Sequence, residues 1–113
     1  MFTNNLEKIT LNNKNYRAVI NTTKNMQLVV MSIKPGVEIG TEIHPITSQF
    51  IRVEQGSALA ILNGEHHLLY DGDYIIIAPK TKHNIINIGN KPLKLYTIYT
   101  PPEHNPNLIQ KTK

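Results

Sequence analysis

From residue 26 onward, apolar residues occur in short runs rich in valine, isoleucine and leucine, and Gly, Pro or Asn interrupts them at close intervals. Such runs are typical of β-strands, and closely spaced turns between them are typical of an all-β sandwich or barrel. We therefore predict an all-β domain. Its strands are expected over residues 26–33, 49–54, 58–62, 66–70, 73–78, 83–88 and 93–99, with one more extended segment around the Glu-Ile-His-Pro sequence at 42–45.

The turn signals between these runs set their pairing. Asn63-Gly64 is the strongest, because both residues tolerate the positive φ of a type I′ turn, and it predicts a hairpin. Before residue 26 the chain is polar and rich in asparagine, which predicts an arm or edge strand with loops and at most a short turn of helix. Residues 100–113 contain three prolines and are predicted to form an extended tail. We expect one domain over 1–113, with an arm (1–25), a barrel (26–99) and a tail (100–113).

Composition limits the chemistry. A hydrophobic share of 40% and a charged share of 18% are typical of a folded domain. The absence of cysteine excludes disulfides, thiolate metal ligands and cysteine nucleophiles, so a metal site would use nitrogen and oxygen ligands. The N-terminal sequence has no apolar signal region and no stretch is long enough to span a bilayer, so we expect a cytoplasmic protein.

The formal net charge of +4 raises the question of an anionic partner. The positive charge is nearly all lysine, scattered along the chain, with Arg17 and Arg52 as the two arginines. There is no basic helix and no platform of interleaved aromatic residues. We therefore expect neither nucleic acid nor a membrane as a partner, and favour a small molecule.

Four polar residues are candidates for a metal or ligand site because of their positions along the predicted strands. Glu42 and His44 are two residues apart in an extended segment, so their side chains share a face. Gln49 opens the next strand, where its parity places it on one face with Ile51 and Val53. His83 opens a later strand after a Pro-Lys-Thr-Lys turn.

The spacing of these residues resembles that of the cupins. Residues 36–56 are similar to the first cupin motif, in which a glycine precedes a His-x-His pair, a glutamate and a second glycine. Residues 72–87 are similar to the second motif, with its glycine, proline, histidine and asparagine. The resemblance implies a small single-domain cupin, which is a double-stranded β-helix or jelly-roll barrel. It also implies a homodimer that pairs through its sheets and often exchanges N-terminal strands.

The resemblance also implies a metal site with an altered ligand set. Glu42 stands where the motif has its first histidine, Gln49 stands where it has glutamate, and Thr81 replaces a glycine. The implied ligands are Glu42, His44, Gln49 and His83. Two imidazoles, one carboxylate and one amide oxygen suit one divalent ion of Fe, Mn, Ni or Zn. The alternative is a barrel that has lost its metal, with Gln49 as a hydrogen-bonded interior amide.

Other polar residues are candidates for contacts to a substrate. His66 and His67 are neighbours on a strand and point to opposite faces, so they cannot chelate together and are expected at the surface or rim. His104 is expected either over the barrel mouth, or at a neighbouring protomer, or in a solvated tail. The sequence indicates no general base other than a ligand carboxylate or a rim histidine, so no catalytic residue is assigned. The substrate-pocket candidates are Arg17, Gln27, Tyr96, Tyr99 and His104.

The first functional hypothesis is a metal-dependent enzyme that acts on a small oxygenated metabolite, such as a sugar derivative or a keto or hydroxy acid. Isomerase, lyase and dioxygenase chemistry all remain open. The alternative is a non-catalytic module that binds or senses a small molecule. Cupins of this kind are often named after mannose-6-phosphate isomerase, and that name rests on the shared fold, which predicts no substrate.

Overall fold

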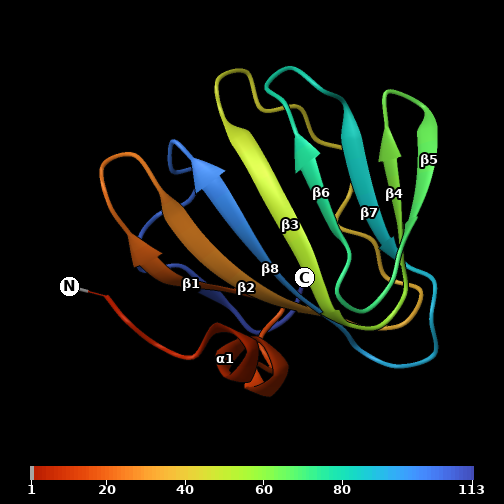
Figure 1. Cartoon of the computed structure of the whole chain (residues 1–113), viewed down its shortest axis with the longest axis horizontal. Coiled ribbons are helices and arrows are strands. Elements are labelled where there is room, and N and C mark those ends of the chain that lie inside the picture. Colours follow the sequence, from red (N-terminus) through yellow and green to blue (C-terminus); the bar gives the residue numbers. More distant parts are fainter. Residues whose placement is uncertain (1) are drawn as a thin grey trace.

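This computed structural model describes residues 2–113, and within them the chain forms nine strands and one short helix joined by loops (Figure 1). The predicted all-β fold class is confirmed. In chain order the elements are α1 (Leu6–Asn12), β1 (Arg17–Thr22), β2 (Gln27–Ile33), β3 (Ser48–Gln55), β4 (Ala58–Leu62), β5 (Glu65–Leu69), β6 (Tyr74–Ile77), β7 (His83–Asn87), β8 (Leu93–Thr100) and β9 (Ile109–Gln110).

The strands form two antiparallel sheets that face each other across the core. The larger sheet has the order β6-β3-β8-β2-β1-β9 and the smaller one has the order β5-β4-β7. In β3 the buried and partly exposed residues alternate, so Gln49, Ile51 and Val53 share the inner face as their parity predicts. Apolar residues of β2, β3, β4, β7 and β8 fill the space between the sheets.

The outer face of the larger sheet carries a second apolar cluster, which α1 covers. Leu6 and Ile9 of the helix pack on this cluster, whose buried members include Val30 and Tyr96. Asn5 caps the helix, because its side chain accepts a hydrogen bond of 2.9 Å from the Lys8 amide. The prediction of at most a short turn of helix is therefore wrong. The asparagines that favoured a loop include the residue that starts the helix.

The predicted hairpin is confirmed at the junction of β4 and β5. Asn63 and Gly64 both have positive φ, at 47° and 81°, as a type I′ turn requires. The N-terminal strand β1 pairs with β2 of its own chain and with the short β9 of the tail. Within residues 2–113, no helix has both the length and the apolar character needed to cross a membrane.

Candidate metal centre

Two segments that are far apart in the sequence bring Glu42, His44 and His83 together. Glu42 and His44 lie on the segment between β2 and β3, and His83 is the first residue of β7. The backbones of Glu42 and His83 form an isolated antiparallel bridge with hydrogen bonds of 2.8 and 2.9 Å. This bridge fixes the segment against β7, so the three side chains are positioned by the sheet rather than by a free loop.

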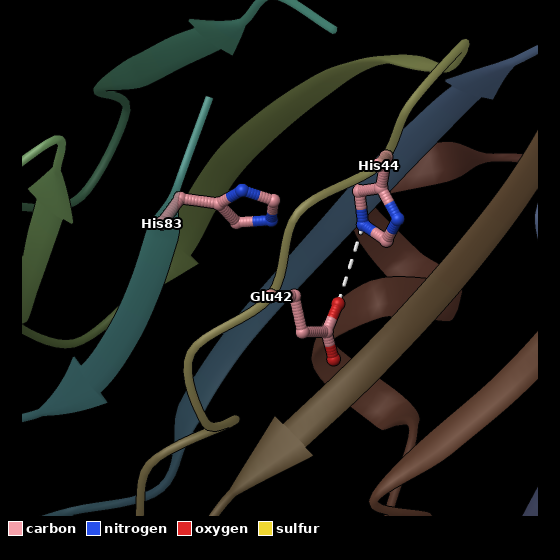
Figure 2. A group of neighbouring side chains, drawn as sticks. All are labelled: Glu42, His44 and His83. Atoms are coloured by element: carbon pink, nitrogen blue, oxygen red, sulfur yellow. Dashed lines mark ion pairs between the residues drawn. The ribbon is translucent and has the colours of Figure 1, made fainter. Parts of the chain in front are cut away.

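The three side chains converge on one point, and we call them the cluster. Each offers one ligand atom, and these atoms all lie within 4.8 Å of one another. Figure 2 shows His83 projecting from β7 toward the segment that carries Glu42 and His44. Both histidines are buried, while the side chain of Glu42 is 35% exposed. The site is therefore enclosed on the histidine side and more open at the carboxylate.

The tautomer of His83 is set by its own turn. Its Nδ1 lies 2.8 Å from the backbone carbonyl of Thr81, which can only accept a hydrogen bond. Nδ1 therefore carries the proton, and Nε2 presents a lone pair. A backbone carbonyl that orients a histidine in this way is a common partner of metal-binding imidazoles.

The tail supplies a carboxylate that does the same for His44. Glu103 Oε1 lies 3.1 Å from His44 Nδ1, so Nδ1 donates and Nε2 faces the cluster. There, His44 Nε2 is 3.2 Å from Glu42 Oε2, yet this buried nitrogen has no hydrogen-bond partner among residues 2–113. A lone pair and a carboxylate at this distance need a cation to hold them together. That cation is either a second proton on His44 or a metal ion, and the missing hydrogen-bond geometry favours the metal.

Gln49 lies on the inner face of β3, beside Tyr99 of β8. Its Nε2 donates a hydrogen bond of 3.0 Å to Thr97 Oγ1, which fixes the orientation of the amide. The other end, Oε1, is buried without a hydrogen-bond partner in the described part of the chain. A buried acceptor without a partner is costly, and a metal ion would satisfy it. The residues present therefore fit a divalent ion with nitrogen and oxygen ligands, although the four-ligand set as a whole stays a prediction.

Gln27 has a different role from the predicted substrate contact. Its buried amide holds the tail: Nε2 donates to His104 O at 2.7 Å and to Thr22 Oγ1 at 3.0 Å. Its Oε1 accepts from the backbone amides of Glu103 and His104, at 3.2 and 2.9 Å. The amide group is fully used by these bonds, so Gln27 positions Glu103 rather than a ligand.

Arg17, Tyr99 and His104 gather beside the cluster. The Tyr99 ring contacts both His44 and His104 edge to face, with centroids 5.9 and 5.1 Å apart. Burial and, to a smaller extent, the nearby charge of Arg17 lower the pKa of His104 to about 4. Burial also raises the pKa of Tyr99. At neutral pH both side chains are therefore uncharged, and His104 Nε2 is buried without a partner.

Arg17 is the positive charge of this group. It lies in β1, where its Nη1 donates a hydrogen bond of 2.9 Å to Gln110 Oε1 and its guanidinium lies 5.3 Å from the centre of the Tyr16 ring. Its Nε is buried, and no residue that the structure describes forms a hydrogen bond with it. The guanidinium therefore keeps donor capacity for an anionic group.

The remaining candidates lie elsewhere. Tyr96 belongs to the outer cluster, where its ring stacks on Phe50 at 6.2 Å, so the structure does not bring it to the site. Parity along β8 explains this, since Tyr96 and Tyr99 face opposite sides. His66 is exposed, and His67 is paired with Glu65 at 3.0 Å. Sequence reasoning missed Glu103, whose one signal was an acidic residue directly before His104.

Comparison with known proteins now identifies the family. The cupin domain family matches residues 29–99, which is more than half of the chain. The chain is a cupin. The predicted resemblance and the jelly-roll fold are therefore confirmed for this cupin.

Three relatives place this cupin more closely. It is 40% identical to YrkC of Bacillus subtilis over 118 residues, covering 99% of this chain and 63% of that protein. It is 47% identical to the protein L612 of Acanthamoeba polyphaga mimivirus, covering 93% of this chain and 68% of that one. A crystal structure from Bacillus halodurans matches with a TM-score of 0.96 and 38% identity, covering 98% of this cupin and 89% of that chain. This cupin thus spans about two thirds of the length of both sequence relatives.

Proposed function

We propose that this cupin binds one divalent metal ion through Glu42, His44, Gln49 and His83, and that it is an enzyme for a small anionic metabolite rich in oxygen. The observation that carries the proposal is the pair formed by His44 Nε2 and Glu42 Oε2, which lie 3.2 Å apart without a hydrogen bond. A sugar acid or a keto or hydroxy acid has the required chemistry. Fe, Mn, Ni and Zn all suit the nitrogen and oxygen ligands.

Different residues of the chain would have different roles around such an ion. Glu103 and the Thr81 carbonyl orient the two imidazoles, so that each presents its Nε2. In this proposal Arg17 would bind the carboxylate of a substrate, and the uncharged His104 would form a hydrogen bond with a hydroxyl or carbonyl group; the unpartnered nitrogens of both side chains within residues 2–113 support these roles. A divalent ion held here would supply Lewis-acid polarisation of a substrate oxygen or, as iron, oxygen chemistry. Isomerase, lyase and dioxygenase reactions all use these elements.

Metal binding is tested on protein stripped with a chelator and titrated with Fe(II), Mn(II), Ni(II) and Zn(II) by calorimetry. We expect one ion per chain and a rise in Tm of at least about 5 °C at saturation, because an ion that binds the folded state alone stabilises it. His83→Asn should abolish both effects, whereas His66→Asn, at an exposed histidine, should preserve them. A site that stays empty with all four ions overturns the proposal.

Catalysis is tested on the loaded protein with panels of keto acids, diketones and sugar acids. Oxygen uptake and proton NMR of the products together detect the three reaction classes. The rival function is a binding module, which is favoured by the weak proton carriers beside the cluster: His104 is hard to protonate and Tyr99 is hard to deprotonate. Saturable binding of a panel compound to the loaded protein, without any turnover, would establish that rival.

A further inference from the structure

A second cavity lies at the opposite end of the larger sheet from the metal centre, and we call it the lysine pocket. Its volume is about 350 Å³, which is within the range of small-molecule sites. Five of the chain's twelve basic residues line it, and none of its lining residues is acidic. The lining residues are Lys14, Tyr16, Ser32, Lys34, Val37, Pro92, Lys94, Lys111, Thr112 and Lys113.

The strands show that the two sites are separate. The lysine pocket includes Ser32 near the end of β2 and Lys94 near the start of β8, whereas Gln27 and Tyr99 mark the opposite ends of these strands at the metal centre. Five residues separate Lys94 from Tyr99, which is roughly 16 Å along a strand. The parity of β8 also turns Lys94 to the outer face, away from the inward-pointing Leu95.

Lys94 is the residue that distinguishes this pocket from a solvated surface. Its side chain is buried within the larger sheet's outer face, where lysine is rarely found without a partner. Its ammonium donates to the backbone carbonyl of Asn13, the one hydrogen-bond partner it has within residues 2–113. Burial lowers the pKa of Lys94, and the positive charge of Lys14 lowers it further. Lys14 and Lys94 thus bring two positive charges close together, and neither charge neutralises the other.

The rest of the lining has a mixed character. Tyr16, Val37 and Pro92 provide apolar walls, and Ser32 and Thr112 provide hydroxyl groups. The nearest acidic residue in sequence to the lining is Glu38, and it meets the pocket through its backbone carbonyl, which accepts from Lys113 Nζ. The pocket therefore has several ammonium donors and no acidic side chain among its lining residues to neutralise them.

We propose that the lysine pocket binds a phosphorylated small molecule, with the phosphate on Lys14, Lys34 and Lys94 and an apolar portion against Tyr16 and Val37. Lysine binds phosphate as a compact point charge with three donors. A cavity of this size lined by lysine, without arginine or exposed aromatic rings, favours a small molecule over nucleic acid. This second site does not depend on the metal centre.

The test uses inorganic pyrophosphate and the full chain, stripped of metal so that the metal centre cannot bind the probe. Calorimetry at constant ionic strength should give one site per chain. In nitrogen–proton correlation spectra, the amide shifts should cluster at Ser32, Lys94 and Thr112 and should leave the Glu42 and His83 amides in place. Citrate, a carboxylate anion of comparable charge, should bind at least about tenfold more weakly.

Matched charge variants decide whether the lysines are responsible. Lys14→Gln with Lys34→Gln removes two exposed pocket charges and should weaken pyrophosphate binding about tenfold or more, because hydrogen bonds to charged groups are lost. Lys8→Gln with Lys24→Gln makes the same change in net charge outside the pocket and should leave the affinity within about twofold. Equal weakening by both pairs, equal binding of citrate, shifts centred on the cluster, or no saturable binding would each overturn the proposal.

Discussion

Glu103 acts on the metal centre through one ring nitrogen of His44. Its carboxylate accepts from Nδ1 at 3.1 Å and is itself held by Thr47, whose hydroxyl lies 3.3 Å from Oε2. Because the bond fixes the tautomer, it keeps the lone pair of Nε2 directed at the cluster. The side chain of Glu103 is about one-third exposed, so its loss should affect metal binding far more than folding.

We therefore predict that Glu103→Gln lowers the affinity for Zn(II) by roughly 10- to 100-fold, as is usual for partners of metal-binding histidines. The measurement is competition with a chelating indicator. Glu103→Asp should recover part of the affinity. Glu65→Gln, in the exposed pair of Glu65 with His67, is the control and should have no effect. An unchanged affinity in Glu103→Gln, with Tm of the metal-free protein also unchanged, would show that Glu103 does not orient His44.

At the scale of elements, the start of β2 holds the tail against the barrel. Residues 27 and 104 are 77 positions apart, and three of the four hydrogen bonds of the Gln27 amide join β2 to residues 103 and 104 of the tail. The fourth goes to Thr22 Oγ1. Replacing Gln27 by leucine would leave the amides of residues 103 and 104 and one carbonyl without partners. Each such group costs about 1–3 kcal/mol when it stays buried, so detachment of the tail is favoured instead.

We predict that Gln27→Leu speeds amide exchange of residues 101–108 by about tenfold or more, while exchange in β3 and β8 stays slow. Hydrogen–deuterium exchange with mass spectrometry reports both regions. Gln55→Leu is a suitable control, because Gln55 Nε2 makes a single bond of 3.0 Å to Pro92 O at the other end of the sheet. Equal protection of the tail in Gln27→Leu and in the unmodified chain would contradict the role given to this amide.

The strands could be predicted because their chemistry is local, and much of the site could not because its contacts are distant. The residues of a run such as 93–99 favour a β-strand by themselves, and Asn63-Gly64 favours a tight turn by itself. Glu42, His44 and His83 were accessible through spacing and family resemblance. Glu103 was not, since nothing near residue 44 indicates which distant carboxylate will meet it. Tyr96 was misassigned because an aromatic residue suits either face of a strand until the register is known.

At the scale of the whole molecule, the unfolding free energy should depend on pH through His104. The folded-state pKa of about 4 lies below the ordinary value of 6.5, so the unfolded chain binds the proton more readily between these values. The contribution of His104 to the free energy of unfolding is fully present above about pH 6.5 and is lost as the pH falls toward about 4. His104 remains partly accessible to water, which reduces the size of the effect.

We predict that the metal-free protein loses more stability between pH 7 and pH 5 than His104→Gln does. Urea unfolding at the two pH values measures the difference, and the change relative to the variant cancels the contribution of other groups. The variant at the exposed His66, His66→Gln, should behave like the unmodified chain. Identical losses in the unmodified chain and His104→Gln would mean that His104 titrates normally. The homodimer and the division into arm, barrel and tail stay predictions at this scale.

The contact between the tail and the barrel also affects the order of events while the chain is synthesised. A ribosome makes Glu42, His44, Gln49 and His83 before it makes Glu103, and the tail partners of the Gln27 amide lie 76 and 77 residues further along the chain. The four proposed ligands are therefore synthesised before the carboxylate that orients His44. We therefore expect that an ion would be selected by the fully oriented site only after elongation past residue 104, and that the metal concentrations of the surrounding compartment would then decide which ion binds.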